Sequence, residues 1–381
     1  MLDKTAMDDR LTFFLCGDVM TGRGIDQILR RPSKPELHEE FVKDAQGYVE
    51  LAEQANGPIP RSALPSYVWG DALEELEKAK PAARIINLET SVTTSESWER
   101  KGINYRMHPR NIEVLQAARI DACALANNHV LDWGRAGLIE TLECLGAYGV
   151  KFAGAGRTLA EAEAPAMIGI PNETGRILLF SMGLWTSGIP SDWAATSRHP
   201  GVDFLGDLSM ASVHKIRARV LALKEPQDIV IFSVHWGDNW GYDIPSEQKD
   251  FAHALIDEAA VDVLHGHSSH HAKGIEVYRE KLVLYGCGDF LNDYEGIRGY
   301  ENFRDDLVLM YFPQVQAGSG KLLSLRMVPM QLSRFRLNRA SQRDARWLCG
   351  ILNREGEGLG TRFRLEGDGS LNLARTEGCK I

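Results

Sequence analysis

The stretch Val230-Ile231-Phe232-Ser233-Val234-His235-Trp236-Gly237-Asp238 guides the interpretation of the whole chain. It is a short apolar run that stops abruptly at His235, Gly237 and Asp238. Four to eight apolar, β-favouring residues bounded by polar ones are typical of a strand that is buried on both faces. A histidine at the end of such a strand is expected at the carboxyl edge of a sheet, where open α/β folds bind their ligands.

The same pattern recurs along the chain. Further apolar runs at 13–16, 85–86, 122–125, 261–264 and 282–285 end in polar residues, which are Gly17-Asp18, Asn87-Leu88-Glu89, Asn127-Asn128-His129, His265-Gly266-His267 and Gly286-Cys287-Gly288-Asp289. Taken alone, each of these ends is equally consistent with a turn, a helix cap or a hydrogen-bonded core histidine. Their recurrence at the ends of several strands predicts an α/β fold with a metal site at the strand carboxyl ends.

The donor types limit which metal such a site would bind. Carboxylate and amide oxygens together with imidazoles suit Mg, Mn, Ca, Fe or Zn. The six cysteines are scattered without a C-x-x-C pair, which argues against a structural zinc site. We therefore expect a divalent metal ion as cofactor.

Length and composition set the class of protein. The chain has 381 residues, 44% of them hydrophobic and 25% charged, which is ordinary for a globular protein able to bury a large core. A formal net charge of -9 argues against nucleic acid or an anionic membrane as a general partner. The first ten residues lack the apolar core of a secretion signal, and no stretch approaches the roughly 20 apolar residues of a membrane helix. We expect a cytoplasmic protein with reduced cysteines.

Two regions stand apart from the strand pattern. Residues 32–65 are polar and carry five prolines, which indicates an insertion of part helix and part loop that could cover a pocket. Residues 307–312 and 323–332 alternate like an antiparallel strand pair. We predict one domain over residues 1–340, with residues 341–381 as a C-terminal helix and tail packed on it.

The polar strand ends also carry a family resemblance. It rests on Gly17-Asp18-Val19-Met20, Asn87-Leu88-Glu89-Thr90, Asn127-Asn128-His129 with Asp132 and Gly134, His235-Trp236-Gly237, Gly266-His267-Ser268-Ser269-His270-His271 and Tyr285-Gly286-Cys287-Gly288-Asp289-Phe290. Together these motifs resemble the CapA family, named for a poly-γ-glutamate capsule protein, within the calcineurin-like metallophosphoesterase superfamily. The resemblance covers Leu11 to Asp293 and implies a four-layer α/β/β/α sandwich.

Carried over by position, the resemblance implies a set of metal ligands, namely Asp18, Glu89, Asn128, His235 and His267. Two departures stand out. Met20 occupies the histidine position of the superfamily's Asp-x-His motif, and Ser269 that of the second histidine in Gly-His-x-His. Losing imidazoles while keeping oxygen donors favours one harder ion, Ca, Mn or Mg, with Zn or Fe as alternatives.

Histidines and carboxylates left free of metal could transfer protons. The candidates for acid–base catalysis are His129, Asp132, His235, Asp18, His270 and Asp289. The CapA-like group includes cytoplasmic members that epimerise a residue of a lasso-peptide precursor. We therefore expect a metal-dependent enzyme acting on a peptide or γ-glutamyl chain, with epimerisation at Cα as the first hypothesis. The alternatives are a phosphoester hydrolase of the superfamily's usual kind and an accessory protein of poly-γ-glutamate capsule synthesis.

Overall fold

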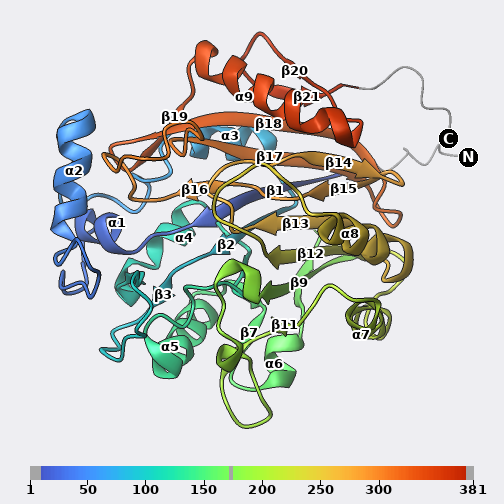
Figure 1. Cartoon of the computed structure of the whole chain (residues 1–381), viewed down its shortest axis with the longest axis horizontal. Coiled ribbons are helices and arrows are strands. Elements are labelled where there is room, and N and C mark those ends of the chain that lie inside the picture. Colours follow the sequence, from blue (N-terminus) through green and yellow to red (C-terminus); the bar gives the residue numbers. More distant parts are fainter. Residues whose placement is uncertain (1–9, 171–174, 375–381) are drawn as a thin grey trace, which may run out of the picture.

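Strand β12 (Ile229–His235) lies in the middle of a sheet, as its apolar sequence predicts. All seven of its residues are buried, and it runs parallel to both neighbours, β9 (Arg176–Leu184) and β13 (Val263–His267). The computed structural model, which describes residues 10–170 and 175–374, places this strand in a seven-stranded sheet (Figure 1). Its order is β11 (Phe204–Leu205), β9, β12, β13, β15 (Lys281–Leu284) and β14 (Ile275–Tyr278), with β8 (Ala166–Gly169) beside β9.

A second, ten-stranded sheet begins with the first strand of the chain. Its parallel half consists of β1 (Arg10–Val19), β2 (Ala83–Leu88), β5 (Ala122–Ala124) and β6 (Lys151–Ala153). Its antiparallel half continues from β1 through β17 (Leu307–Gln316), β18 (Leu322–Ser333), β21 (Leu371–Leu373) and β20 (Phe363–Leu365). Two short strands complete it, β16 (Asp289–Leu291) beside β1 and β19 (Arg336–Arg339) beside β18. The predicted antiparallel pair is therefore confirmed as β17 and β18.

The two sheets face each other across an apolar core. Side chains alternate along β1, so that Phe13 and Leu15 join a cluster with Ile229 and Ile231 of the smaller sheet. The intervening Phe14 belongs to a second cluster, on the opposite face of the larger sheet. This alternation is the period of two that buries both faces of a strand.

Helices cover the outer faces of both sheets (Figure 1). The larger sheet carries α3 (Ala72–Ala79), α4 (Glu113–Ala117) and α5 (Gly134–Ala147), whose leucines fill the outer cluster. The smaller sheet carries α7 (Met210–Leu221) and α8 (Ser246–Glu258) on a third cluster. The remaining helices of the described chain are α1 (Arg23–Ile28), α2 (Gln46–Asn56), α6 (Leu159–Glu163) and α9 (Gln342–Gly356). The predicted α/β class is confirmed as a mixed α/β fold with several sheets.

The end of β1 fits closely against the loop before β16. A Cβ atom on Gly17 would lie 1.6 Å from the carbonyl oxygen of Gly288, so only glycine fits at position 17. The Asp18 amide donates to that same carbonyl at 3.0 Å. This close approach fixes Asp18 next to the segment that carries Asp289.

The segment after residue 340 adds more than a helix. Leu348 and Leu352 of α9 join the cluster between the sheets, and β20 and β21 extend the larger sheet. The predicted insertion at residues 32–65 contains one helix, α2, which lies next to α1 (Figure 1). Residues 375–381 of the predicted tail lie outside the described part of the chain.

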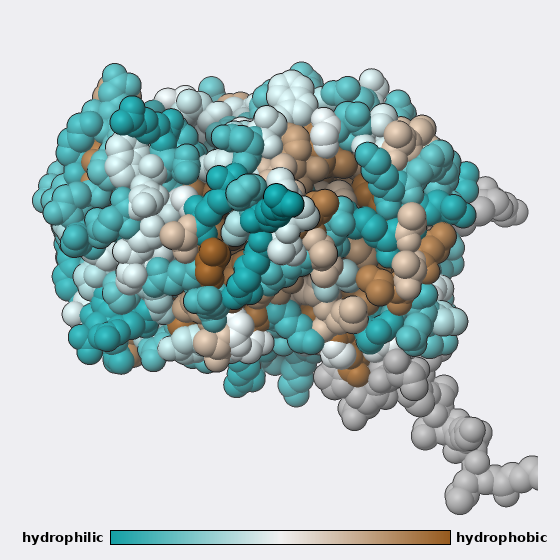
Figure 2. Space-filling model, turned by 90° about the horizontal axis from the view of Figure 1, so that it is seen from below, coloured by the Kyte–Doolittle hydropathy of each residue, from teal (hydrophilic) through white to brown (hydrophobic). Residues whose placement is uncertain are grey.

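The surface is mixed in character. Figure 2 shows one face on which hydrophilic residues dominate and hydrophobic ones show between them toward the centre and right. Trp185, which is 63% exposed, is among the large apolar side chains that reach the surface. Within residues 10–170 and 175–374, no helix combines the length and the apolar character that crossing a bilayer requires.

Candidate metal centre

Three strands from the two sheets end at one point. Asp18 near the end of β1, His235 at the end of β12 and His267 at the end of β13 form a buried group that could hold a metal ion. One potential ligand atom from each lies within 4.8 Å of the others. Nδ1 of His235 is 2.7 Å from Nδ1 of His267, which is 3.9 Å from Oδ1 of Asp18. Side chains at the carboxyl ends of strands from both sheets thus meet in a single cluster.

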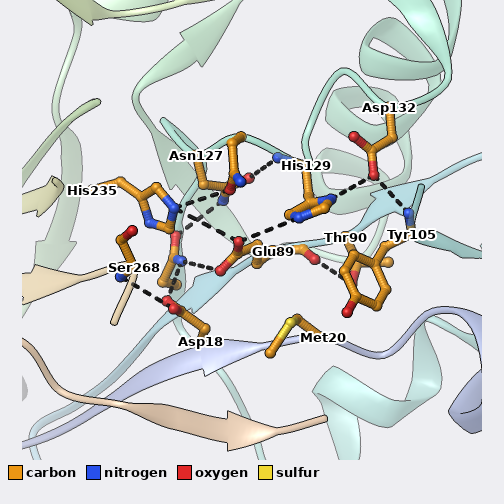
Figure 3. Close-up of polar contacts among 12 residues, drawn as sticks. Asp18, Met20, Glu89, Thr90, Tyr105, Asn127, His129, Asp132, His235 and Ser268 are labelled. Atoms are coloured by element: carbon orange, nitrogen blue, oxygen red, sulfur yellow. Dashed lines mark hydrogen bonds and ion pairs between the residues drawn. The ribbon is translucent and has the colours of Figure 1, made fainter. Parts of the chain in front are cut away.

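Glu89 and Asn128 lie on the other side of the His235 ring. Nε2 of His235 is 3.0 Å from Oδ1 of Asn128 and 3.6 Å from Oε1 of Glu89. Figure 3 shows the Glu89 carboxylate between His235, Asp18 and His129. The structure therefore brings together all five residues predicted as metal ligands.

A chain of hydrogen bonds fixes which nitrogen of His267 is free. The carbonyl of Cys16 accepts from Nε2 of His265 at 2.7 Å, so the other nitrogen of that ring accepts from Ser233 at 3.1 Å. The Ser233 oxygen then accepts from Nε2 of His267 at 2.7 Å. Because burial lowers the pKa of His267, this ring is neutral and its Nδ1 carries a lone pair.

That lone pair points at His235 Nδ1 in a fully buried position. Two neutral imidazole nitrogens 2.7 Å apart require either a shared proton or a cation between them. An imidazole whose second nitrogen is held by a neighbouring group is the usual arrangement of a metal ligand. The donor chemistry of His235 and His267 therefore fits a divalent cation.

Three buried carboxyl groups crowd the same place. Burial, with Asp289 nearby, raises the pKa of Asp18 to about 7. Burial, with Asp18 and Asp289 nearby, raises the pKa of Glu89 well above its usual value. Like charges in a desolvated site disfavour ionisation unless a positive charge compensates them. A bound divalent cation would supply that charge and restore both carboxylates.

Side-chain amides hold the carboxylates in place. Nδ2 of Asn87 donates to Asp18 at 2.7 Å and lies 3.4 Å from Glu89, while its oxygen accepts from Asn127 at 3.0 Å. The backbone amide of Ser268 donates to the other oxygen of Asp18 at 3.2 Å. Asn87 and Asn127 stand in the motifs that carry the resemblance, yet sequence reasoning gave neither a role of its own.

His129 is oriented by a carboxylate and points at the cluster. Its Nδ1 donates to Asp132 at 2.7 Å, and its Nε2 faces Oε1 of Glu89 at 3.8 Å (Figure 3). Burial lowers the pKa of His129 to about 4, although Asp132 opposes the shift. The backbone amide of Tyr105 also donates to Asp132, at 2.6 Å. His129 is thus a neutral imidazole with one free nitrogen directed toward Glu89.

Lys101 is a site residue that sequence reasoning missed. Its ammonium group donates to Asp132 at 2.8 Å and to the carbonyl oxygen of Asn128. It comes from the polar loop between β3 (Ser91–Val92) and β4 (Arg106–Met107), where charged residues are ordinary. No local signal separates Lys101 from its neighbours in that loop, because its role depends on where the loop folds.

A second histidine–carboxylate pair lies beside the cluster. Nδ1 of His270 donates to Asp289 at 2.9 Å, and Asn292 donates to the other oxygen of Asp289 at 2.9 Å. Burial disfavours protonation of His270, but the Asp289 carboxylate outweighs burial and raises its pKa. All six residues predicted for acid–base chemistry therefore lie in or next to one site.

The two departures from the superfamily pattern have structural counterparts. The sulfur of Met20 contacts the Tyr294 hydroxyl at 3.6 Å, and the Ser269 hydroxyl donates to the carbonyl of His271 at 3.0 Å. Neither position supplies an imidazole. Among the described residues, the only group of three or more His, Cys, Asp or Glu with this spacing is that of Asp18, His235 and His267.

Comparisons with known proteins agree with the motif resemblance. Residues 12–294 match the family described as bacterial capsule synthesis protein PGA_cap. The chain is 46% identical over 367 residues to a probable polyglutamine synthesis accessory protein of Mycobacterium tuberculosis, covering 96% of each chain. It is 25% identical over 310 residues to the PGA biosynthesis protein CapA of Bacillus subtilis, covering 81% of this chain and 69% of that relative. The CapA-like resemblance is confirmed.

Proposed function

Because the chain belongs to the bacterial capsule synthesis protein family PGA_cap, we propose that it is a divalent-cation-dependent accessory protein of poly-γ-glutamate synthesis. The role is that of its relatives, which carry names of polyglutamine and PGA synthesis. The observation that carries the cation requirement is the convergence of Asp18, His235 and His267 in one buried group. Of the functions expected from sequence, the accessory role is the one that the relatives' names support, and none of these names refers to an epimerase.

We further propose that the facing sheets and their outer helices are a calcineurin-like sandwich. Three apolar clusters separate four layers in the order helices, sheet, sheet, helices. In this proposal, Asp18, His235 and His267 would hold the cation, and Glu89 and Asn128 lie beside it at the other nitrogen of His235. A bound divalent cation supplies a Lewis acid that polarises a substrate oxygen.

The other side chains of the site would handle protons. His129 Nε2 is unprotonated and directed at the cluster, so it accepts a proton from a group bound there and returns it. Asp132 keeps the His129 ring in the required tautomer and stabilises its charged form. Lys101 and the Tyr105 amide hold Asp132 in turn. The proposed substrate is a γ-glutamyl chain or its precursor.

The test is polymer synthesis in cells that lack the native protein and produce variants of it. We expect His235→Gln to abolish γ-glutamyl polymer while the variant accumulates as folded protein. His253→Gln is the matched control, because His253 is a partly buried histidine paired with Glu276 at 3.0 Å outside the cluster. Full polymer synthesis with His235→Gln would refute the proposal.

Cα epimerisation is a second candidate, favoured by one observation. Two histidine–carboxylate pairs, His129 with Asp132 and His270 with Asp289, flank the cluster, and a two-base proton exchange needs two such groups. Incubating the protein with γ-glutamyl peptides in deuterated water tests this directly. Deuterium at Cα is expected from an epimerase, whereas its absence would leave the accessory role alone.

A further inference from the structure

A cavity of about 290 Å³ lies on the helical side of the larger sheet. Its lining residues are Leu29, Arg30, Arg31, Ala63, Pro65, Arg110, Asn111, Glu113, Val114 and Tyr148. Three arginines line it, Arg30, Arg31 and Arg110. The functions expected from the sequence do not involve this cavity. The cation-site residues Asp18, Glu89, Asn128, His235 and His267 do not line it.

The floor of the cavity is fixed by buried contacts. The buried side chain of Asn111 accepts from the Arg31 amide at 3.2 Å and donates to the Arg31 carbonyl at 2.9 Å. The Ala63 amide donates to the Ile28 carbonyl at 2.8 Å. These bonds tie three separate segments together and hold the two arginine-bearing stretches at fixed positions around the cavity.

The arginine side chains themselves are exposed. Within the described part of the chain, none of Arg30, Arg31 and Arg110 forms an ion pair with an acidic side chain, including Glu113, which also lines the cavity. The chain as a whole has a formal net charge of -9. Three unpaired guanidinium groups around one cavity are therefore a local positive site on a negative protein.

The three arginines of the cavity favour an anionic ligand. Guanidinium groups bind carboxylates through paired N–H donors. Exposed arginine–carboxylate contacts are individually weak, and repetition along a polymer makes them effective.

We propose that the cavity of Arg30, Arg31 and Arg110 is an anchoring site for carboxylates of a γ-glutamyl chain. This inference rests on the proposed function for the identity of the polymer, but not on the cation. The same chemistry would also accept inorganic phosphate, so the experiment separates the two anions.

The test measures binding of fluorescently labelled poly-γ-glutamate by anisotropy at low and moderate salt. We expect the triple variant Arg30→Gln, Arg31→Gln, Arg110→Gln to weaken binding about tenfold or more at low salt, since three charged contacts are removed. The matched control replaces three exposed arginines that form no ion pair in the described chain, Arg343, Arg346 and Arg362, and should change binding less than about threefold. Thermal unfolding of each variant confirms that it is folded.

Each other outcome decides against the proposal. Equal weakening in both triple variants would mean that net charge alone drives binding. Displacement of the polymer by inorganic phosphate at constant ionic strength would assign the cavity to phosphate. Absence of polymer binding by the wild-type protein would remove the site altogether. Loss of the cation site is measured as polymer synthesis in cells producing His235→Gln, and loss of the anchoring site as polymer binding by the triple arginine variant, so the two failures are distinguishable.

Discussion

Replacing Lys101 by methionine should destabilise the protein by about 2 kcal/mol. The substitution keeps the aliphatic stem but leaves Oδ1 of the fully buried Asp132 without the ammonium donor that lies 2.8 Å away. Removing one partner of a buried ion pair costs about 3–5 kcal/mol. The Lys101 side chain is 20% exposed, so water compensates part of the loss and the lower value is appropriate.

Urea unfolding at neutral pH, with free energies obtained by linear extrapolation, measures this loss. Lys101→Arg keeps the charge and should recover more than half of the stability. Lys34→Met is the surface control, because Lys34 pairs with Glu96 at 3.3 Å while both side chains are more than half exposed. That control should lose less than about 1 kcal/mol. If Lys101→Met loses no more unfolding free energy than Lys34→Met, the ion pair of Lys101 with Asp132 does not stabilise the fold.

Three further predictions test other parts of the structure. A divalent cation at a hundred times its dissociation constant should stabilise the wild type and His253→Gln by about 2.7 kcal/mol in calorimetry, but not His235→Gln. Gly17→Ala should cost about 3 kcal/mol or more in urea unfolding, since its Cβ would overlap a backbone carbonyl, whereas Gly146→Ala on the open face of α5 should be neutral or stabilising. Burial lowers the pKa of His271 to about 4, so the folded state disfavours protonation of this ring. The free energy of unfolding is therefore unaffected by His271 above about pH 6.5 and falls as the pH is lowered from there toward 4. The stability lost between pH 7 and pH 5 should therefore be about 1–2 kcal/mol smaller in His271→Gln than in the wild type.

The strand ends were predictable because an apolar run gives way to polar residues at or near the end of each strand. β12 ends at His235, where its apolar run stops, and β13 continues past the end of its apolar run at Leu264 to His267. Parallel pairing then brings both ends to one edge, a consequence of topology that needs no knowledge of individual contacts. β1 is less simple, because it continues to Val19 beyond Asp18 and pairs there with β16 across an irregular register.

The rest depended on contacts that sequence patterns do not encode. Lys101 reaches Asp132 only because a polar loop folds back over it, and Ser233 matters only because His265 and His267 flank it in the next strand. Strands β20 and β21 have three residues each, too few for a period of two to be recognised. Such features follow from tertiary packing, which overrides weak local preference.

In the proposed function, the site holds one cation, and protein side chains rather than a second metal ion transfer protons. A second cation beside the first would need further ligands near Asp18, where Met20 contacts the Tyr294 hydroxyl and His270 is bonded to Asp289. Two-metal hydrolysis depends on a pair of ions clamping both the attacking and the leaving oxygen. Instead of a second metal ion, the site has the neutral imidazole of His129, whose free Nε2 is directed toward Glu89. We therefore expect one divalent ion per chain by elemental analysis, and two ions per chain would overturn the single-cation proposal.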